Sequence, residues 1–389
     1  NNSNFQETRI QPGYELLPGA DSDIIEAGGL QFGPYIGDIV RHVDRLALVR
    51  GMSMDTLGHA TGKRRFLTGK PPSGLQARGS SGATWLASRL GREHDIPNLA
   101  VRVESYNKDQ PNFASGIKVS NVGDLLKAIR ADRPFSEQLV DQQIEALLQQ
   151  DAACTRALIS RFGDKAESAR RKSLEMTSSG LGDTFDFLAN NTEMATIRSH
   201  YGFAKNTNGL GTPGARAALA AKAIMSGVTR TVSVTLNGGF DTHGLNWAAV
   251  QGPRQMAGFN AIARLVEDLS STQYKDTGST WMDHTNIIAF SEFSRTSMLN
   301  NNFGRDHWLN SACLVLGADV KGGQIIGASS DMGMQPQPIN LETGLVDNTE
   351  AGVSVNPEHV LQTLIHAIGY RNDPADLRVD PIFALLKNS

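Results

Sequence analysis

Two kinds of hydrophobic pattern alternate along most of the chain. After Pro34, apolar residues repeat at the three- and four-residue spacing of an amphipathic helix, and the continuous apolar run over residues 46–49 is typical of a short buried strand. The same patterns predict helices over 83–90, 256–269 and 357–368 and strands over 98–103, 231–236, 285–290 and 312–316. This alternation predicts an α/β fold with an open, mostly parallel sheet and functional loops at the carboxyl ends of its strands.

The pattern changes between residues 121 and 226. Apolar residues there recur at three- and four-residue steps within long polar segments, as at Leu139, Val140 and Ile144, and strand signals are missing. We therefore predict one α/β domain over residues 1–389 with a large helical insertion over residues 121–226. The insertion is expected to form a cap over one edge of the sheet. The alternative is a helical domain that binds a partner.

The composition is that of an ordinary globular protein and argues against several other classes of protein. Hydrophobic residues make up 40% of the chain and charged residues 20%, as in ordinary globular proteins, and a net charge of −3 gives no basic footprint for nucleic acid. No apolar run reaches the about eighteen residues that a transmembrane segment needs. The two cysteines, Cys154 and Cys313, are too few for a disulfide scaffold. Because the chain begins at Asn1 without a methionine or a signal peptide, we expect processing or truncation upstream.

Metal-type ligands follow directly where the predicted strand over 231–236 ends. Asp241 and His243 are two positions apart, so an extended backbone would direct both side chains to the same side. Carboxylate and imidazole groups are ligands for Zn²⁺ and similar ions. An aspartate turn beside a surface histidine is the alternative. A second pair, Asp306 and His307, in a later loop favours the metal site.

A basic run follows the predicted strand at residues 46–49. A loop that contains several glycines leads there into Lys63, Arg64 and Arg65 at the start of a predicted helix. This layout is typical of an anion site, because the free N–H groups and the dipole of a helix N-terminus favour negative charge. The charge run alone favours another interpretation, a solvated basic turn.

Four short motifs occur in order along the chain. They are Gly238-Gly-Phe-Asp-Thr-His243, Ser291-Glu-Phe-Ser-Arg-Thr296, Arg305-Asp-His307 and Leu316-Gly-Ala-Asp-Val-Lys-Gly-Gly323. Together they resemble the alkaline phosphatase and sulfatase superfamily and, within it, an exported bacterial group, the domain-of-unknown-function family number fifteen hundred and one. The resemblance covers most of the chain outside the helical block. It implies an alkaline-phosphatase-like sheet sandwiched by helices, and export to the periplasm or the cell exterior.

The resemblance also implies roles for residues in the basic segment. The stretch from His59 to Lys70 is similar to the sulfatase segment that carries the nucleophile. This similarity places His59 at the position of the nucleophile and Lys63 at that of its activating cation. An imidazole acts as a covalent nucleophile or as a general acid or base. The alternatives for His59 are a metal ligand and a structural hydrogen-bond donor.

A metal centre is the second implication of the resemblance. Asp241 and His243 resemble the pair that binds the first metal, and His307 resembles its last ligand. Many relatives carry Asp-His for a second metal at the positions of Glu292 and Phe293. Glu292 is a candidate ligand. Phenylalanine cannot bind a metal. We therefore expect one divalent ion (Zn, Ca or Mn) or none. The first strand of the sheet would lie upstream of the chain, so its position is unfilled unless a separate fragment or a neighbouring chain supplies it.

Two functional hypotheses follow. In the first, the protein is a metal-dependent hydrolase of phosphate or sulfate esters that acts on a small anionic ester or a polymer. Asp306 is then a further ligand or orients His307, and Lys63, Arg64 and Arg295 hold the anionic group. In the second, the protein is a catalytically silent homologue that binds a protein partner or assembles with itself in an exported or cell-envelope structure.

Overall fold

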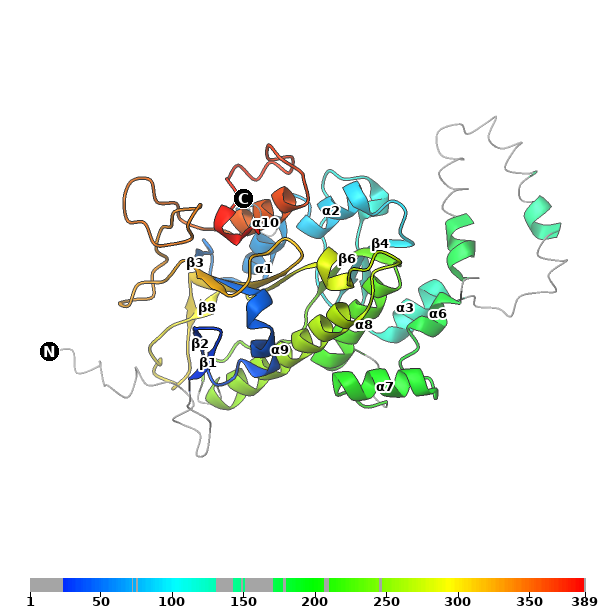
Figure 1. Ribbon diagram of the computed structural model, residues 1–389, viewed down its shortest axis with the longest axis horizontal. Helices are drawn as coiled ribbons and strands as arrows, with labels where there is room; N and C mark the ends of the chain where they lie inside the picture. The colour runs from blue at the N-terminus through cyan, green and yellow to red at the C-terminus, as the bar shows by residue number, and fades with distance from the viewer. Residues whose placement is uncertain are drawn as a thin grey trace. The chain divides into compact units, whose positions relative to one another are not determined.

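The structure is a computed structural model, and it describes most of residues 24–387 (Figure 1). The segments within that range that it does not describe are residues 72, 75, 131–142, 148–149, 151–170, 178–179, 206–209 and 245–246. The chain divides into two compact units. Residues 1–118 and 212–389 form the main unit, and residues 119–211 form the insertion unit.

Strands and helices alternate along the described residues. The strands are β1 (Ile25–Ala27), β2 (Leu30–Phe32), β3 (Leu46–Ser53), β4 (Ile96–Val101), β5 (Ile117–Val119), β6 (Thr229–Val234), β7 (Asn286–Phe290), β8 (Ser294–Arg295), β9 (His307–Trp308), β10 (Asn310–Gly317) and β11 (Gln324–Ile326). The α-helices of the main unit are α1 (His59–Thr68), α2 (Gly82–Leu90), α8 (Pro213–Met225), α9 (Trp247–Ser271) and α10 (Pro357–Ala367). Its 3₁₀ helices are η3 (Gly37–Arg45), η4 (Asn112–Ala114), η5 (Trp281–His284) and η6 (Phe383–Leu385).

The larger sheet has the strand order β11-β3-β10-β7. β11 runs parallel to β3, whereas β10 is antiparallel to both of its neighbours, β3 and β7. The prediction of a mostly parallel sheet is therefore only partly confirmed. The apolar runs that predicted these strands contain no information on direction, because a strand that is buried on both faces has the same pattern in either direction.

The smaller sheet has the strand order β5-β4-β6. β4 and β6 are parallel, with Val101 opposite Val234 at their carboxyl ends. All six residues of β4 are buried, as expected for a strand that lies inside a sheet with both faces covered. Parallel pairing thus occurs in both sheets, and the α/β class is confirmed.

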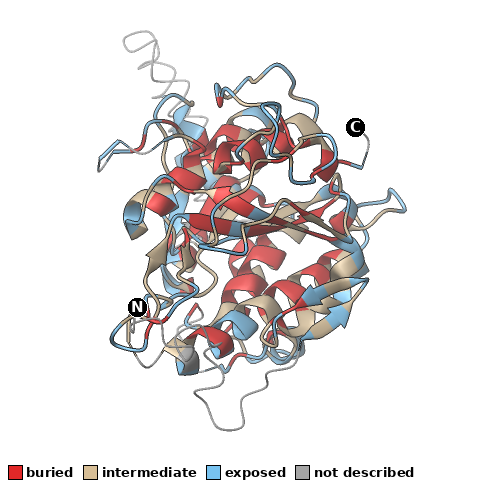
Figure 2. Ribbon diagram, turned by 90° about the vertical axis from the view of Figure 1, so that its left-hand side faces the viewer, coloured by how far each residue is buried: buried red, intermediate tan, exposed pale blue. Residues whose placement is uncertain are grey.

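Helices cover both faces of the strands in the main unit (Figure 2). On one face, Val49 of β3 packs with Phe66 of α1 and Val360 of α10. On the other face, Leu46 of β3 packs with Val266 of α9. Successive side chains of a strand point to opposite faces, so this one strand contributes to both apolar clusters.

Most predicted elements of the main unit are present, with shifted ends. The helices predicted over 83–90, 256–269 and 357–368 correspond to α2, α9 and α10, and α9 begins earlier, at Trp247. The helical pattern after Pro34 gives the 3₁₀ helix η3, in which His42 has non-helical backbone angles. Among the described helices, none is long and apolar enough to span a membrane.

The described part of the insertion unit contains the helices α3 (Val122–Ile129), α6 (Leu181–Thr184) and α7 (Thr192–Tyr201). The residues Leu139 and Val140 of the predicted helical pattern lie outside the described residues. The predicted insertion 121–226 also includes α8, which belongs to the main unit and contacts α9 and β6. The single-domain assignment and the role of the insertion as a cap stay predictions.

Candidate metal centre

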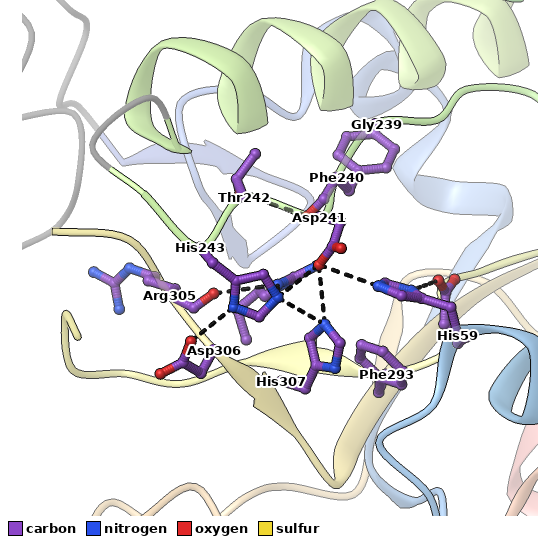
Figure 3. Close-up of polar contacts among 12 residues, drawn as sticks. His59, Gly239, Phe240, Asp241, Thr242, His243, Phe293, Arg305, Asp306 and His307 are labelled. Atoms are coloured by element: carbon purple, nitrogen blue, oxygen red, sulfur yellow. Dashed lines mark hydrogen bonds and ion pairs between the residues drawn. The ribbon is translucent and has the colours of Figure 1, made fainter. Parts of the chain in front are cut away.

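Loops at the ends of several strands bring the polar residues of the main unit together (Figure 3). Asp241 and His243 follow β6, and His307 is the first residue of β9. His59 is the first residue of α1, and Glu292 follows β7. The candidate site therefore lies at the carboxyl ends of β6 and β7, as the α/β pattern predicted.

A single carboxylate oxygen is the centre of the site. Asp241 Oδ1 lies 2.7 Å from Nε2 of His243, 3.0 Å from Nε2 of His307 and 3.1 Å from Nε2 of His59. The Nε2 atoms of His243 and His307 are 3.1 Å apart. Arg295 Nη2 donates to the same oxygen at 3.0 Å. Asp241 and the three histidines are called the histidine–aspartate cluster.

The other ring nitrogen of each histidine contacts an oxygen that accepts hydrogen bonds. The three Nδ1 contacts are His59 with Glu292 Oε1 at 2.6 Å, His243 with Asp306 Oδ1 at 2.7 Å and His307 with the carbonyl oxygen of Leu57 at 2.7 Å. A backbone carbonyl and an ionised carboxylate only accept, so we assign the proton of each neutral ring to Nδ1. The lone pair on each Nε2 then points into the cluster.

These lone pairs would repel one another unless a cation lies between them. The three Nε2 atoms lie 2.7–3.1 Å from Asp241 Oδ1, which is close to the spacing of ligand atoms around a metal ion. Metal–ligand bonds of about 2.1 Å give ligand–ligand distances of about 3.0–3.4 Å. His59 Nε2 is buried and makes no hydrogen bond, although it lies 3.1 Å from Asp241 Oδ1. A buried atom without a hydrogen bond, in a set of nitrogen and oxygen donors, fits a metal ligand.

The ligand atoms of His59, Asp241 and His307 all lie within 4.8 Å of one another, so these residues form a group that can hold a metal ion. The Asp241 side chain is 51% exposed, and an ion or a substrate can therefore reach the group from solvent. The His–Asp–His combination is a possible metal-ligand group, and it lies where the sequence predicted one. The identity of the ion belongs to the proposal that follows.

Hydrogen bonds keep both aspartates of the site ionised. The close contact with His307 holds the pKa of Asp241 well below its ordinary value, against the effect of burial, and the hydrogen bond from Arg295 and the contact with His59 act in the same direction. The pKa of Asp306 is also lowered, first by the hydrogen bond from His243 and then by that from Asn300. Ionised carboxylates are the forms that bind cations and imidazole N–H groups.

Asn300 and Gly304 fix the positions of His243 and Asp306. Asn300 Nδ2 donates to the carbonyl oxygen of His243 at 3.0 Å and to Asp306 Oδ1 at 2.9 Å. Its Oδ1 accepts the N–H of Gly304 at 3.0 Å. A Cβ atom on Gly304 would lie 2.0 Å from the carbonyl carbon of His243. The positioning role of Asn300 was not predicted, and the polar run over residues 300–302 was its only signal in the sequence.

Gln251 of α9 holds the backbone on both sides of Asp241. Its Nε2 donates to the carbonyl oxygen of Phe240 at 2.7 Å and to Thr242 Oγ1 at 2.9 Å. Gln251 and Thr242 are buried, so both hydrogen bonds are shielded from water. Gln251 is therefore a second positioning residue, and its role was not predicted from the sequence.

One protein family matches this chain over most of its length. The sequence profile of the family described as "Protein of unknown function (DUF1501)" matches residues 6–363. The chain belongs to this family. No curated protein matches the chain. The predicted family is thereby confirmed, and the wider likeness to the alkaline phosphatase superfamily stays a prediction.

In this DUF1501 member, the basic run lies inside α1 and its residues have different surroundings. Lys63 is exposed and lies one helical turn from His59, on the same side of α1. Arg64 instead donates to the hydroxyl of Tyr106 and to the carbonyl oxygen of Gly74, both at 3.2 Å. Lys63 therefore lies on the same side of α1 as His59, whereas the Arg64 side chain contacts Tyr106 and Gly74.

The interpretation of the basic run as a solvated turn is wrong for Arg65, which is buried. Its side chain is only 1% exposed and lies 2.6 Å from Glu358 Oε2 of α10. Arg65 Nη2 also donates to Asp55 Oδ2 at 3.0 Å. A buried cation needs such partners, because removing a charge from water is costly without them.

The predicted ligands Glu292 and Asp306 lie behind histidines. Each carboxylate contacts an Nδ1 atom, of His59 and His243 respectively, while the Nε2 atoms face the cluster. Phe293 packs against the rings of His59 and His307, with ring centroids 5.0 and 4.3 Å apart. The structure thus gathers the three histidines and Arg295 around Asp241, and Glu292 and Asp306 contact the far sides of the His59 and His243 rings.

Proposed function

We propose that this protein is a metal-dependent hydrolase of phosphate or sulfate esters, with one divalent ion bound by the histidine–aspartate cluster. The convergence of three Nε2 atoms on Asp241 Oδ1 supports the proposal most strongly, because each ring is held by an acceptor at Nδ1. Such partners orient metal-binding histidines and raise their basicity. The resemblance to alkaline phosphatases and sulfatases supports the class of substrate, and export to the periplasm or cell exterior is part of the same proposal.

The donor set favours zinc among the three expected ions. The two imidazole nitrogens of His59 and His307 and the carboxylate oxygen of Asp241 suit Zn²⁺, whereas Ca²⁺ prefers a shell of six to eight oxygens. Mn²⁺ is the weaker alternative, because it is favoured by carboxylate and carbonyl ligands. A second ion is not part of the proposal, because Phe293 offers no ligand atom at the position where relatives carry histidine.

When bound, Zn²⁺ would polarise the ester and lower the pKa of a bound water. His59 acts as a ligand in this proposal and not as the nucleophile. Arg295 lies against Asp241 and His243 and would bind the anionic group of the substrate. Lys63 would add a second positive charge from α1. Arg64 has no part in this proposal, because its side chain contacts Tyr106 and Gly74.

Metal analysis and an isosteric substitution test the proposal. Asp241→Asn keeps the shape of the side chain and removes the charge, so we expect Zn²⁺ affinity to fall at least about a hundredfold. Hydrolysis of 4-nitrophenyl phosphate and 4-nitrophenyl sulfate should be lost with the metal. Asp347→Asn is the matched control, because Asp347 is a surface-turn aspartate that hydrogen-bonds to Thr349. A wild-type protein that binds no Zn²⁺ and hydrolyses neither ester contradicts the proposal.

One observation favours the silent-homologue hypothesis as a second candidate. Arg295 Nη2 donates to Asp241 Oδ1 at 3.0 Å, so a positive charge already contacts the central oxygen without a metal. In that case, the cluster is a network of hydrogen bonds and the protein binds a partner without chemistry. The same experiment separates the two hypotheses, since the silent homologue requires no Zn²⁺ and Asp241→Asn would change only stability.

A further inference from the structure

Large apolar side chains are exposed on the loops that carry the histidine–aspartate cluster. Leu57 lies two residues before His59, Leu309 lies two residues after His307, and both leucines are 44% exposed. The carbonyl oxygen of Leu57 contacts the ring of His307, so the two leucines lie on adjacent segments of the chain. Contiguous exposed apolar residues mark binding surfaces more often than single ones do.

The turn over residues 300–304 exposes a phenylalanine beside the same cluster. Phe303 pairs with Gly244 in an isolated antiparallel bridge, and it is 56% exposed. Asn300 Nδ2 donates to the carbonyl oxygen of His243 at 3.0 Å, so the turn is held against the loop that carries Asp241 and His243. Phe303 therefore lies next to the candidate metal centre.

The backbone of Phe303 is strained. Its φ angle is 58°, in the left-handed region that favours glycine and asparagine, and among the described non-glycine residues with positive φ it is the only aromatic one. Burial of the ring does not offset this strain, because more than half of the residue is exposed. Strained residues cluster at functional sites, where the conformation serves a ligand. An exposed aromatic residue in such a conformation points to contact with a ligand.

The charged and the apolar parts of the site are neighbours along the chain as well. Arg295 Nη2 donates to Asp241 Oδ1, and Met298, which is 39% exposed, follows Arg295 by three residues. A ligand whose anionic group lies at Arg295 would extend toward these apolar residues. Leucine, methionine and phenylalanine side chains donate no hydrogen bonds, so the hydroxyl groups of a sugar would lose their bonds to water there without replacement.

We propose that Leu57, Met298, Phe303 and Leu309 form an apolar rim, which binds the alcohol group of the ester substrate. The alcohol group is then an aromatic ring or an aliphatic chain and not a sugar or a nucleoside. The inference rests on the proposed function, because the anionic group must bind at the cluster before the apolar rim can contact the alcohol group.

Phenylphosphonate and methylphosphonate are the probes, because their carbon–phosphorus bond separates binding from ester hydrolysis. In isothermal titration of the Zn²⁺-loaded full chain, phenylphosphonate should bind at least about tenfold more tightly than methylphosphonate. Phe303→Asn should reduce this ratio to about two or less, because the ring is removed. Phe113→Asn is the matched control, since Phe113 is also exposed but lies in η4 without a positive φ, and it should leave the ratio unchanged.

Stability gives a second measurement on the same variants. Asparagine adopts a positive φ more readily than phenylalanine, so Phe303→Asn should raise the midpoint of urea unfolding while it lowers the affinity for phenylphosphonate. Phe113→Asn should not raise the midpoint. A lower midpoint in Phe303→Asn would mean that the ring stabilises the fold itself, and this result would overturn the proposal.

The remaining outcomes separate the apolar rim from the hydrolase proposal. Equal affinity of the wild-type protein for the two phosphonates, or a ratio that Phe303→Asn leaves unchanged, overturns the apolar rim. A dimer that dissociates in Phe303→Asn also overturns it, because the surface would then join two copies of the chain. If the wild-type protein hydrolyses neither 4-nitrophenyl ester but shows the expected ratio, the apolar rim is supported and only the hydrolase proposal fails.

Discussion

At the scale of single residues, the three histidines of the cluster differ in what holds Nδ1. Two of the Nδ1 partners are carboxylates, Glu292 and Asp306, and the third is the backbone carbonyl of Leu57. A carboxylate raises the basicity of the imidazole that it accepts from. His59 and His243 are therefore expected to be the stronger donors to a metal, and His307 the weaker one.

Asp306→Asn tests this outer contact without touching a proposed ligand. The amide oxygen still accepts the hydrogen bond from His243 but carries no charge, so we expect the affinity for Zn²⁺ to fall about 10–100-fold. Isothermal titration with Zn²⁺ measures the change, and Asp347→Asn again serves as the control. Unchanged affinity in Asp306→Asn would mean that the Nδ1 contact does not contribute to metal binding.

The residues of the site were predictable to different degrees. Asp241, His243 and His307 stand in short motifs directly after strands or between them, so their types and positions pointed to a common site. The place of His59 in the cluster remained open, because an imidazole serves as nucleophile, base or ligand. The acceptor for His307 is the carbonyl of Leu57, and a backbone group has no side-chain signal in the sequence.

At the scale of elements, two glycines allow the loops of the site to approach closely. Gly62 of α1 lies against the loop after β7, where an added Cβ would be 3.0 Å from the Cβ of Glu292. Gly304 lies against the backbone of His243 and Gly244, where an added Cβ would be 2.0 and 2.2 Å from their atoms. Backbone moves less readily than a side chain, so Gly304 is the stricter requirement.

Gly304→Ala is therefore expected to move the loop that carries His243 away from the loop that carries Asp306. The matched control is Gly238→Ala, because no atom lies within 4 Å of a Cβ at Gly238. We expect Gly304→Ala to destabilise the protein by about 1–3 kcal/mol, the cost of inserting a group into a packed site, and to lower Zn²⁺ affinity. Urea unfolding and zinc titration measure the two effects. Equal behaviour of the two variants would contradict the close approach.

The direction of the strands was the main property of the elements that could not be predicted from the sequence. The apolar runs located β7 and β10 within two residues of their observed starts, 286 and 310 against 285 and 312. The mostly parallel arrangement was inferred from the alternation of strands with helices. No helix separates β9 from β10, and β10 returns antiparallel to β3 and β7. The position of strands thus follows from local pattern, whereas their direction depends on long-range pairing.

At the scale of the whole main unit, a buried ion pair connects α1, which carries His59, with α10 near the end of the chain. Arg65 Nη2 donates to Glu358 Oε1 at 3.0 Å, and Nη1 lies 2.6 Å from Oε2. The two side chains are 1% and 11% exposed. Asp55, the other partner of Arg65, lies two residues before Leu57, whose carbonyl contacts His307. The pair therefore supports the base of the candidate metal centre.

Removal of one partner of the Arg65–Glu358 pair should lower the free energy of unfolding far more than removal of a surface charge. Glu358→Ala leaves the Arg65 guanidinium buried with only Asp55 as a charged partner, so we expect a loss of about 3–5 kcal/mol in the free energy of unfolding. Glu104→Ala breaks the exposed pair with Lys118, in which both side chains are more than half exposed, and should cost at most about 1 kcal/mol. Urea denaturation at constant pH compares the two variants. If both lose the same small amount, the guanidinium is hydrated in the native state, and the ion pair does not hold α1 against α10.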